Sequence, residues 1–158
     1  MKKSIIAFIS LITLCIEPLM ASAEFSFKKY QVENGLSHNT TWRAIQDSYG
    51  FLWIGTSNGL NCYYGSGNKI YRNVLNDKYS LGNNFVSSLM EEGEDLWIGT
   101  SSGLYIYDRS DDHFLYFDKT TKYGVFISCE VKKIVKTKNG LIWIATLGLS
   151  LIHISEPT

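Results

Sequence analysis

One five-residue pattern recurs along the chain and limits the folds open to it more than any other feature. Each copy places a tryptophan between aliphatic residues and ends in a threonine; the copies are residues 52–56, 96–100 and 142–146. Their tryptophans, Trp53, Trp97 and Trp143, are separated by 44 and 46 residues. A period in the forties, with turn residues beside each copy, is typical of stacked or radially repeated structures. The chain is therefore expected to be a repeat protein.

Each copy also predicts a β-hairpin. The apolar run around the tryptophan is rich in β-formers and indicates a strand, and the turns that follow end in Gly59 and Gly103, where glycine supplies the positive φ of a tight turn. Further strand-like runs flank these hairpins, at residues 41–46, 60–64, 69–72, 85–90, 104–107, 114–117 and 131–135. Four short antiparallel strands per period are typical of a propeller blade. The predicted fold class is all-β: four-stranded β-propeller blades, incomplete, about two and a half blades of a larger propeller.

Two roles for the tryptophans remain open. The favoured role is packing between adjacent blades, where burial of one ring is worth about 2–3 kcal/mol, and the alternative is contact with a ligand. Gly55 and Gly99 are expected to let a neighbouring backbone approach closely, and Ala145 keeps the same position small in the third copy. The residues assigned to the structural repeat motif are Trp53, Gly55, Thr56, Gly59, Trp97, Gly99, Thr100, Gly103, Trp143 and Thr146.

Composition indicates a globular chain and weighs against nucleic acid as a partner. Of 158 residues, 45% are hydrophobic and 14% aromatic, and 15 basic residues balance 15 acidic ones. Because no basic run or stripe is present, this region is expected to bind no nucleic acid.

The first 23 residues have the pattern of a secretory signal peptide. Two lysines precede an apolar stretch, residues 5–16, that is too short for a comfortable membrane span. Cleavage is expected after Ala23, which ends a small-x-small sequence. A lipid anchor on Cys15 is disfavoured because Leu14 is too large for a lipoprotein signal. The protein is therefore predicted to be exported.

The mature chain divides along the repeat. An N-terminal strand or lead-in at residues 24–39, suited to complete the last blade of a closed propeller, is followed by blade 1 (40–79), blade 2 (80–126) and a partial blade 3 (127–148). The repeat pattern fails after Thr146. All ten residues 149–158 match one reading frame of a transposon-type sequencing adapter, CTG TCT CTT ATA CAC ATC TCC GAG CCC ACG. We expect this tail to be a library-preparation artefact, so His153 and Glu156 receive no functional role.

The repeat resembles a known family. A Gly-x-Leu-Trp-Ile-Gly-Thr-x-x-Gly-Leu pattern preceded by an acidic residue is similar to the two-component-regulator propeller repeat, found in the exported sensor region of hybrid two-component systems in Bacteroides-type bacteria. Residues 30–39 resemble the usual lead-in to the first blade. The resemblance covers residues 25–146, and the third copy departs from the pattern at Ala145 and loses its turn.

The resemblance implies a parent larger than this chain. Such sensors carry two propellers, a β-sandwich, a membrane helix, a histidine kinase and a receiver, and many sense oligosaccharides released from glycans. It therefore implies a periplasmic fragment of a parent anchored in the inner membrane, with an oligosaccharide ligand, the rest of the sensor chain as partner, and pairing of the parent as a homodimer. The alternatives are a propeller scaffold that binds protein, or a fragment of a propeller enzyme acting on carbohydrate.

Candidate site residues are few. No catalytic, cofactor-binding or metal-binding residue is predicted, since the acidic groups near residues 91–95 and 108–112 fit solvated turns. Exposed aromatic residues are the better indication, because their faces stack on sugars and on apolar partners alike. Trp42, which lacks a counterpart in the second copy, is the candidate ligand-binding residue, and Tyr63, Tyr64 and Tyr105 lie near the hairpins.

Overall fold

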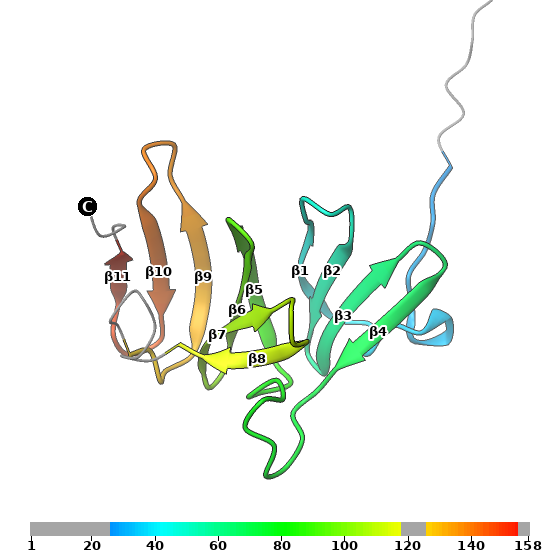
Figure 1. The fold of residues 1–158 in the computed structure, drawn as a ribbon, viewed down its shortest axis with the longest axis horizontal. Coiled ribbons are helices and arrows are strands. Elements are labelled where there is room, and N and C mark those ends of the chain that lie inside the picture. The colour runs from blue at the N-terminus through cyan, green and yellow to red at the C-terminus, as the bar shows by residue number, and fades with distance from the viewer. Residues whose placement is uncertain (1–25, 118–125, 155–158) are drawn as a thin grey trace, which may run out of the picture.

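The computed structural model of this chain describes residues 26–117 and 126–154. Its strands form three antiparallel sheets that lie side by side in chain order (Figure 1). Sheet 1 contains β1 (Thr41–Gln46), β2 (Leu52–Thr56), β3 (Gly59–Tyr64) and β4 (Gly67–Tyr71). Sheet 2 contains β5 (Val86–Glu92), β6 (Asp95–Thr100), β7 (Gly103–Asp108) and β8 (His113–Tyr116). Sheet 3 contains β9 (Val131–Lys136), β10 (Ile142–Thr146) and β11 (Leu151–Ile154).

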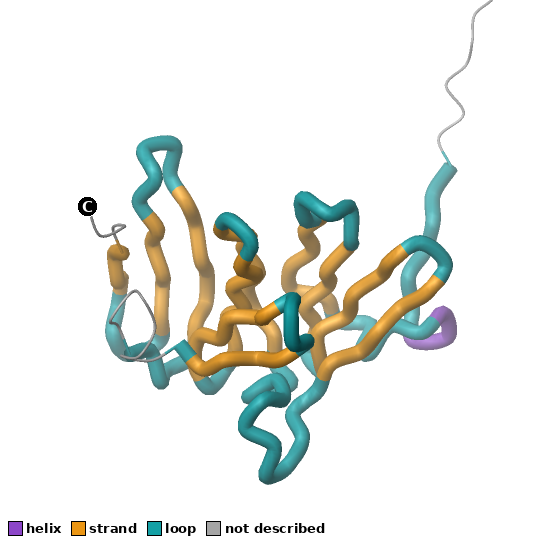
Figure 2. Tube along the Cα trace, viewed as in Figure 1, coloured by secondary structure: helices purple, strands orange, loops and turns teal. Residues whose placement is uncertain are grey.

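The three sheets repeat one register. The tryptophan strand is second in each sheet and pairs on both sides, so that Trp53 lies opposite Ile45 and Cys62, and Trp97 lies opposite Met90 and Ile106. The first strand of each sheet carries a register shift near its start, at the bulged positions Trp42, Ser87 and Lys132. Short loops join the strands within each sheet (Figure 2), and longer connections, residues 72–85 and 117–130, join successive sheets.

The threonine that ends each tryptophan strand fixes the following turn. Thr56 Oγ1 donates to the Gly59 carbonyl at 2.9 Å, and Thr100 Oγ1 donates to the Gly103 carbonyl at 2.9 Å. Both oxygens also accept the backbone N–H two residues further on, at 3.0 and 3.2 Å. The glycines have φ of +125° and +138°, a conformation that residues with a side chain rarely adopt.

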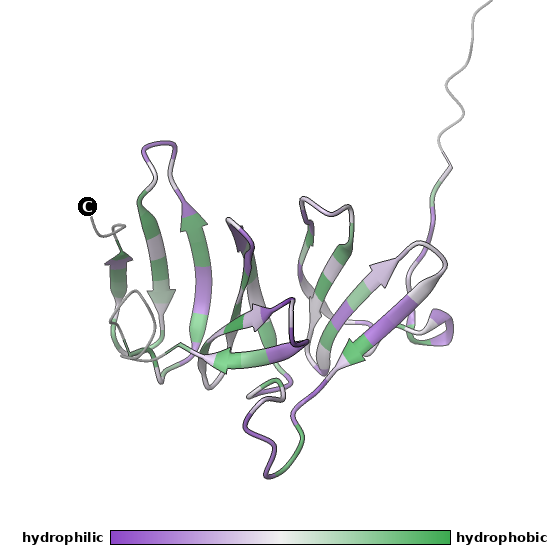
Figure 3. Ribbon diagram, viewed as in Figure 1, coloured by the Kyte–Doolittle hydropathy of each residue, from purple (hydrophilic) through white to green (hydrophobic). Residues whose placement is uncertain are grey.

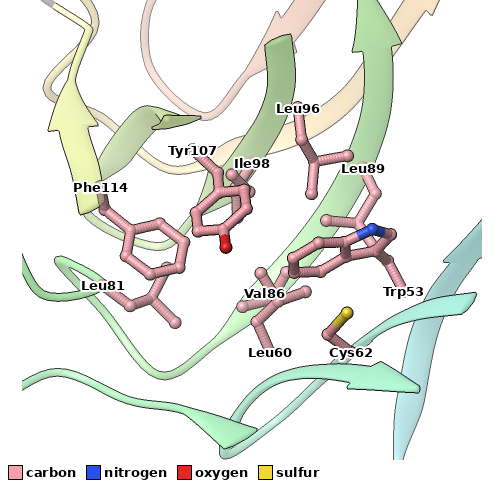
Figure 4. Close-up of a cluster of buried hydrophobic side chains, with 10 residues drawn as sticks. All are labelled: Trp53, Leu60, Cys62, Leu81, Val86, Leu89, Leu96, Ile98, Tyr107 and Phe114. Atoms are coloured by element: carbon pink, nitrogen blue, oxygen red, sulfur yellow. The ribbon is translucent and has the colours of Figure 1, made fainter. Parts of the chain in front are cut away.

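Apolar side chains fill the spaces between sheets. Alternating hydropathy along the strands is visible in Figure 3, where the tip of the β9–β10 hairpin is hydrophilic. Trp53 is 1% exposed and points between sheets 1 and 2, with Leu60 and Cys62 on one side and Val86 and Leu89 on the other (Figure 4). A second cluster joins sheets 2 and 3; it contains Trp97, Leu104, Ile106, Phe117, Ile127, Val131, Ile134, Ile142, Ile144 and Ile154.

The first strands of sheets 2 and 3, β5 and β9, pack against the sheet before them. A Cβ placed on Gly55 would lie 2.7 Å from Val86 Cγ1 of β5, and one on Gly99 would lie 2.7 Å from Val131 Cγ1 of β9. Real Cβ atoms essentially never approach so closely. The two glycines therefore set the spacing between successive sheets.

Two expectations for the ends of the chain are corrected. Residues 26–31 are not a strand, and a 3-10 helix, η1 (Val32–Asn34), follows them, since no described strand lies beside this segment to pair with its backbone. The third hairpin does not lose its turn. A longer connection closes it, with Thr146 N–H donating to the Ser150 carbonyl at 2.9 Å and positive φ at Gly148 and Ser150.

Several predicted segments lie outside the described residues. These are the signal peptide with its cleavage site at Ala23, residues 118–125 of predicted blade 2, and residues 155–158 of the tail. Residues 151–154 of that tail form β11, in which His153 lies opposite Trp143. Within the described ranges no helix has both the length and the apolar character needed to cross a bilayer.

Candidate functional site

A groove of about 740 Å³ opens between sheets 1 and 2. This volume lies within the usual range of about 300–1,000 Å³ for small-molecule sites. Its aromatic residues come mainly from sheet 1; they are Tyr49, Phe51, Trp53, Tyr64, Tyr71 and Tyr107. Its charged residues come mainly from sheet 2; they are Lys69, Glu94, Asp95, Asp108 and Arg109. Aromatic rings and hydrogen-bonding groups therefore share one concave surface.

The floor of the groove is a packed aromatic cluster. The Trp53 ring stacks on Tyr71 with centroids 5.9 Å apart and meets the Tyr107 ring edge-on at 5.1 Å. The Tyr71 and Tyr107 hydroxyls lie 2.9 Å apart, and each is 2.7 Å from Asp112 Oδ1, to which it donates. Lys69 pairs with the other carboxylate oxygen of Asp112. The cluster therefore joins β4 of sheet 1 to the β7–β8 hairpin of sheet 2.

These contacts shift the pKa values of the cluster. Burial raises the pKa of Tyr107 to about 12, and burial together with hydrogen bonding to Tyr107 and Asp112 raises the pKa of Tyr71 further. Burial also acts to raise the pKa of Asp112, but the hydrogen bonds from Lys69, Tyr107 and Tyr71 outweigh it and leave that pKa below its usual value. At neutral pH the tyrosines are thus protonated donors and Asp112 is a charged acceptor.

Arg109, in the β7–β8 turn, lines the groove. Its guanidinium donates to Asp47 Oδ2 at 2.7 Å and to Glu91 Oε1 at 3.2 Å, and lies 4.6 Å from the centre of the Tyr49 ring. Asp47 also accepts the Trp53 indole N–H at 2.7 Å. Burial acts to raise the pKa of Asp47, but the hydrogen bonds from Trp53 and Arg109 prevail and lower it. Both cations of the groove are therefore engaged by carboxylates.

The mouth of the groove presents exposed aromatic rings. Tyr49 is 57% exposed, Phe51 38% and Tyr64 44%, and the Phe51 and Tyr64 rings meet edge-on with centroids 6.1 Å apart. Tyr64 also leans over Gly67, where an added Cβ would lie 2.8 Å from its ring. Three half-exposed rings at a groove can contact a ligand without any change in the packed floor.

The aromatic residues Phe51 and Tyr64 at this mouth are not repeated at the corresponding positions of sheet 2. Leu52 pairs with Tyr63 in sheet 1, and Leu96 pairs with Tyr107 in sheet 2. One residue further out, sheet 1 has Phe51 and Tyr64, whereas sheet 2 has Asp95 and Asp108. All four line the groove, so the same repeat position carries an aromatic pair in sheet 1 and an acidic pair in sheet 2.

The sequence-predicted site residues are only partly brought together here. Tyr64 lines the groove, and Trp53 forms part of its floor. Trp42, on β1, is 53% exposed but lies away from the groove, beside the C-terminal end of β2. There its indole N–H donates to Ser57 Oγ at 3.0 Å. Tyr63 packs on Tyr30 with ring centroids 4.7 Å apart. The candidate ligand residue and the groove are therefore separate features of sheet 1.

The remaining motif residues have scaffold positions. Trp97, Thr56 and Thr100 are fully buried, whereas Trp143 is half-buried with its ring 5.3 Å from that of His153. Thr146 hydrogen-bonds at the end of the third hairpin through its N–H. No cluster of three or more metal-ligating side chains occurs within residues 26–117 and 126–154.

Sequence reasoning missed the polar half of the site. The acidic residues near 91–95 and 108–112 were expected to be solvated turns, but Glu91 pairs with Arg109, Glu92 pairs with Lys136 at 2.6 Å, and Asp112 anchors the aromatic floor. The Glu92–Lys136 pair joins sheets 2 and 3, and Asp112 joins sheet 2 to Lys69 and Tyr71 of sheet 1. The sequence alone does not place these residues together. The unlike residues at one repeat position, aromatic at 51 and 64 and acidic at 95 and 108, were the available signal.

Comparison with known proteins identifies the repeat. The family described as two component regulator propeller matches residues 35–58 and 80–102, which contain the first two tryptophan hairpins. These two segments match the two component regulator propeller repeat. The predicted resemblance and the predicted incomplete propeller of four-stranded blades are thereby confirmed.

Relatives of this repeat chain are much longer proteins. Histidine kinase P4 of Formosa agariphila is 38% identical over 68 residues, which are 43% of this chain and 5% of that protein. The extracellular domain of BT3049 of B. thetaiotaomicron, described as a hybrid two component system, matches with a TM-score of 0.65 and 21% identity. That of BT4673, described as a one component system, matches with a TM-score of 0.62 and 24% identity.

The likeness to these two structures is a likeness of fold. The matches cover 82% and 81% of this chain, but only 17% and 18% of the solved chains. The chain therefore spans a small part of the proteins that it resembles, and it resembles propeller sensor domains of two-component systems.

Proposed function

We propose that this chain is the N-terminal part of the periplasmic ligand-sensing propeller of a hybrid two-component regulator. In this proposal the mature chain begins after Ala23, the parent is anchored in the inner membrane, and a homodimeric parent passes the signal to its histidine kinase. The ligand is an oligosaccharide derived from a glycan. The observation that carries the proposal is a groove with half-exposed aromatic rings inside a two component regulator propeller.

The chemistry of the groove suits a sugar ligand. Aromatic rings offer flat apolar faces to the C–H faces of pyranoses, while the neighbouring carboxylates accept hydroxyl hydrogen bonds. The volume of about 740 Å³ accommodates a short oligosaccharide. A binding site recessed between two sheets also favours a small ligand over a protein scaffold function, because protein interfaces need broad, complementary surfaces.

Ligand-dependent stabilisation tests this function. The complete sensor region of the parent would be melted in the presence of neutral and acidic oligosaccharides, with chromatography of the sugars before and after incubation. We expect one class to raise the melting temperature without being cleaved, since ligand that binds only the folded state stabilises it. Turnover would indicate an enzyme, and the absence of stabilisation by any oligosaccharide would contradict the proposal.

A further inference from the structure

We infer that the first strands of the three sheets, β1, β5 and β9, carry a second binding site, for an oligosaccharide with a carboxylate or sulfate group. In this site the Trp42 ring stacks on a sugar and the Arg43 guanidinium binds the anionic group. The inference rests on the proposed function; it adds a site apart from the groove between sheets 1 and 2, together with the class of its ligand.

A hollow of about 360 Å³ runs across these first strands. Strand β5 packs against β1 on one side and against β9 on the other (Figure 1). The apolar part of the hollow includes Leu89 and Met90, and its charged residues are Arg43, Glu91 and Lys136. Because propeller blades surround a central channel, and successive sheets meet at these strands, the hollow lies on the channel side of the sheets.

The register shift in each first strand directs two neighbouring side chains toward the next sheet. In sheet 2 these are Ser87 and Ser88, and both hydroxyls hydrogen-bond to the backbone of β9. The corresponding residues of sheet 1 are Trp42, whose ring meets the connection to sheet 2, and Arg43, which lines the hollow. A small hydroxyl is enough to link neighbouring sheets at this position. The repeat therefore does not require an indole or a guanidinium there.

Trp42 is held in place while half of it stays open. Its indole N–H donates to Ser57 Oγ at 3.0 Å, and its ring packs on Phe85 with centroids 5.1 Å apart. These contacts fix the ring, yet 53% of Trp42 remains exposed. A fixed and half-exposed indole offers an apolar face to a pyranose ring at a low cost in side-chain entropy.

Arg43 is the cation of the hollow that is left to bind a ligand. It is exposed, and none of its five N–H donors bonds to a residue in the described part of the chain. The other charged residues of the hollow are paired, Lys136 with Glu92 at 2.6 Å and Glu91 with Arg109 at 3.2 Å. The planar fork of an arginine matches a carboxylate or sulfate group, to which it can donate two parallel hydrogen bonds.

The same register position supplies a second cation in sheet 3. Lys133 lies opposite Ala145 as Arg43 lies opposite Gly55, and its ammonium has no ion-pair partner among the described residues. In a closed ring, residues at one register position surround the channel at one level, and rings of arginine or lysine side chains favour anions. Two of the three sheets thus present an unpaired cation at this level.

Calorimetric titration of the complete sensor region of the parent tests the charge. Short oligosaccharides that carry a uronate, and others that carry a sulfate, would be compared with neutral ones of the same length. Arg43→Gln should weaken binding of the anionic ligand about tenfold, as for loss of one hydrogen-bonded charge, and leave binding of neutral ligands unchanged. The matched control is Lys138→Gln, because Lys138 is an exposed cation in the β9–β10 turn, outside the hollow.

A second variant tests the ring. Trp42→Ala should weaken binding of the same ligand about threefold to tenfold, the range for one aromatic contact. Tyr79→Ala is its control, because Tyr79 is 40% exposed and stacks on His113 outside the hollow. Since Arg43 has no partner among the described residues, Arg43→Gln should keep the melting temperature of the unmodified region. A loss of binding in that variant then reports on the site and not on the fold.

The outcomes separate this site from the sensing function itself. Unchanged affinity in both Arg43→Gln and Trp42→Ala, or binding of neutral oligosaccharides alone, would overturn the inference while leaving the sensing function intact. Failure of every oligosaccharide to bind would instead refute the proposed function, and the inference with it.

Discussion

Asp47 contacts both the tryptophan of the first repeat motif and an arginine of the neighbouring sheet. Its carboxylate is buried, accepts the Trp53 indole N–H and two backbone N–H groups of its own turn, and receives Arg109 from the neighbouring sheet. Because a buried carboxylate is costly without partners, these donors stabilise the folded state only as long as Asp47 is charged. The Asp47 side chain thus orients the Trp53 ring and links sheet 1 to sheet 2 through Arg109.

Asp47→Asn should lower the free energy of unfolding by about 2 kcal/mol at pH 7, as for loss of a hydrogen-bonded charge. The folded-state pKa of Asp47 is lowered, so its contribution is present above the unfolded pKa of about 3.9 and is lost as the pH falls below it. The difference in melting temperature between the unmodified sensor region and the variant should therefore shrink between pH 7 and pH 3. A difference that stays constant would show that the charge is not responsible.

Thr56 provides a second test at the scale of one atom. Thr56→Val keeps the side-chain shape but removes a buried hydroxyl that hydrogen-bonds to Gly59, Asn58 and Ser37. The free energy of unfolding should fall by about 1–3 kcal/mol. Thr146→Val is the matched control, because the Thr146 hydroxyl makes a single 3.4 Å contact, with the Ser150 carbonyl. Its free energy of unfolding should therefore change by no more than about 0.5 kcal/mol. Equal melting temperatures for the two variants would contradict the role assigned to Thr56 in its turn.

At the scale of the element, the spacing between successive sheets is determined by a glycine in the tryptophan strands of sheets 1 and 2, Gly55 and Gly99. Gly55→Ala would place a Cβ 2.7 Å from Val86 Cγ1 and 3.0 Å from the Val86 carbonyl oxygen. Overpacking against a neighbouring backbone should destabilise the propeller by about 1–3 kcal/mol. Ala145→Gly, the reverse change at the same repeat position, should cost no more than about 1 kcal/mol, the usual penalty for glycine inside a strand. Denaturant unfolding of both variants would compare the two effects.

Most of the strands were predictable because local chemistry specifies them. The apolar runs, the threonine and glycine of each turn, and the spacing of the tryptophans predicted β1 with its observed limits and placed β2 to β10 within a few residues. Residues 26–31 were not predictable in the same way. An alternating sequence becomes a strand only beside a partner, and none lies next to this segment among the described residues.

The site was less predictable than the fold. Tyr64 was one of three tyrosines noted near the hairpins, and Trp42 was chosen as the candidate because it has no counterpart in the second copy. The sequence did not show that Trp42 lies away from the groove, beside Ser57. Arg109 and Asp112 contribute through contacts with residues 62 and 41 positions away, Asp47 and Tyr71. Contacts between sheets depend on how the blades are placed side by side, and a single sequence carries no local signal for that placement.

At the scale of the whole molecule, each sheet depends on its neighbours, as in other repeat proteins. Sheet 3 carries exposed apolar side chains, with Val135 40%, Leu147 61%, Leu149 53% and Leu151 57% accessible. An exposed apolar sheet with an open edge is a site of self-association. The isolated mature chain should therefore elute above its monomer mass in size-exclusion chromatography with light scattering. A monomer with a sharp, cooperative thermal transition would contradict this expectation.

The tail of the chain requires a test at the level of DNA. Strand β11 pairs with β10 through backbone hydrogen bonds, which any extended segment can make at an open edge, so this pairing is compatible with either origin of residues 149–158. We predict that long-read sequencing of the source locus, without the transposon adapter, will show codons after Gly148 that restore a further hairpin strand and continue into more tryptophan repeats. The same ten codons followed by a stop in genomic DNA would refute the adapter origin. In that case a short exported propeller segment that assembles with copies of itself would replace the larger sensor as the working hypothesis, because sheet 3 would then have to be covered by a second chain.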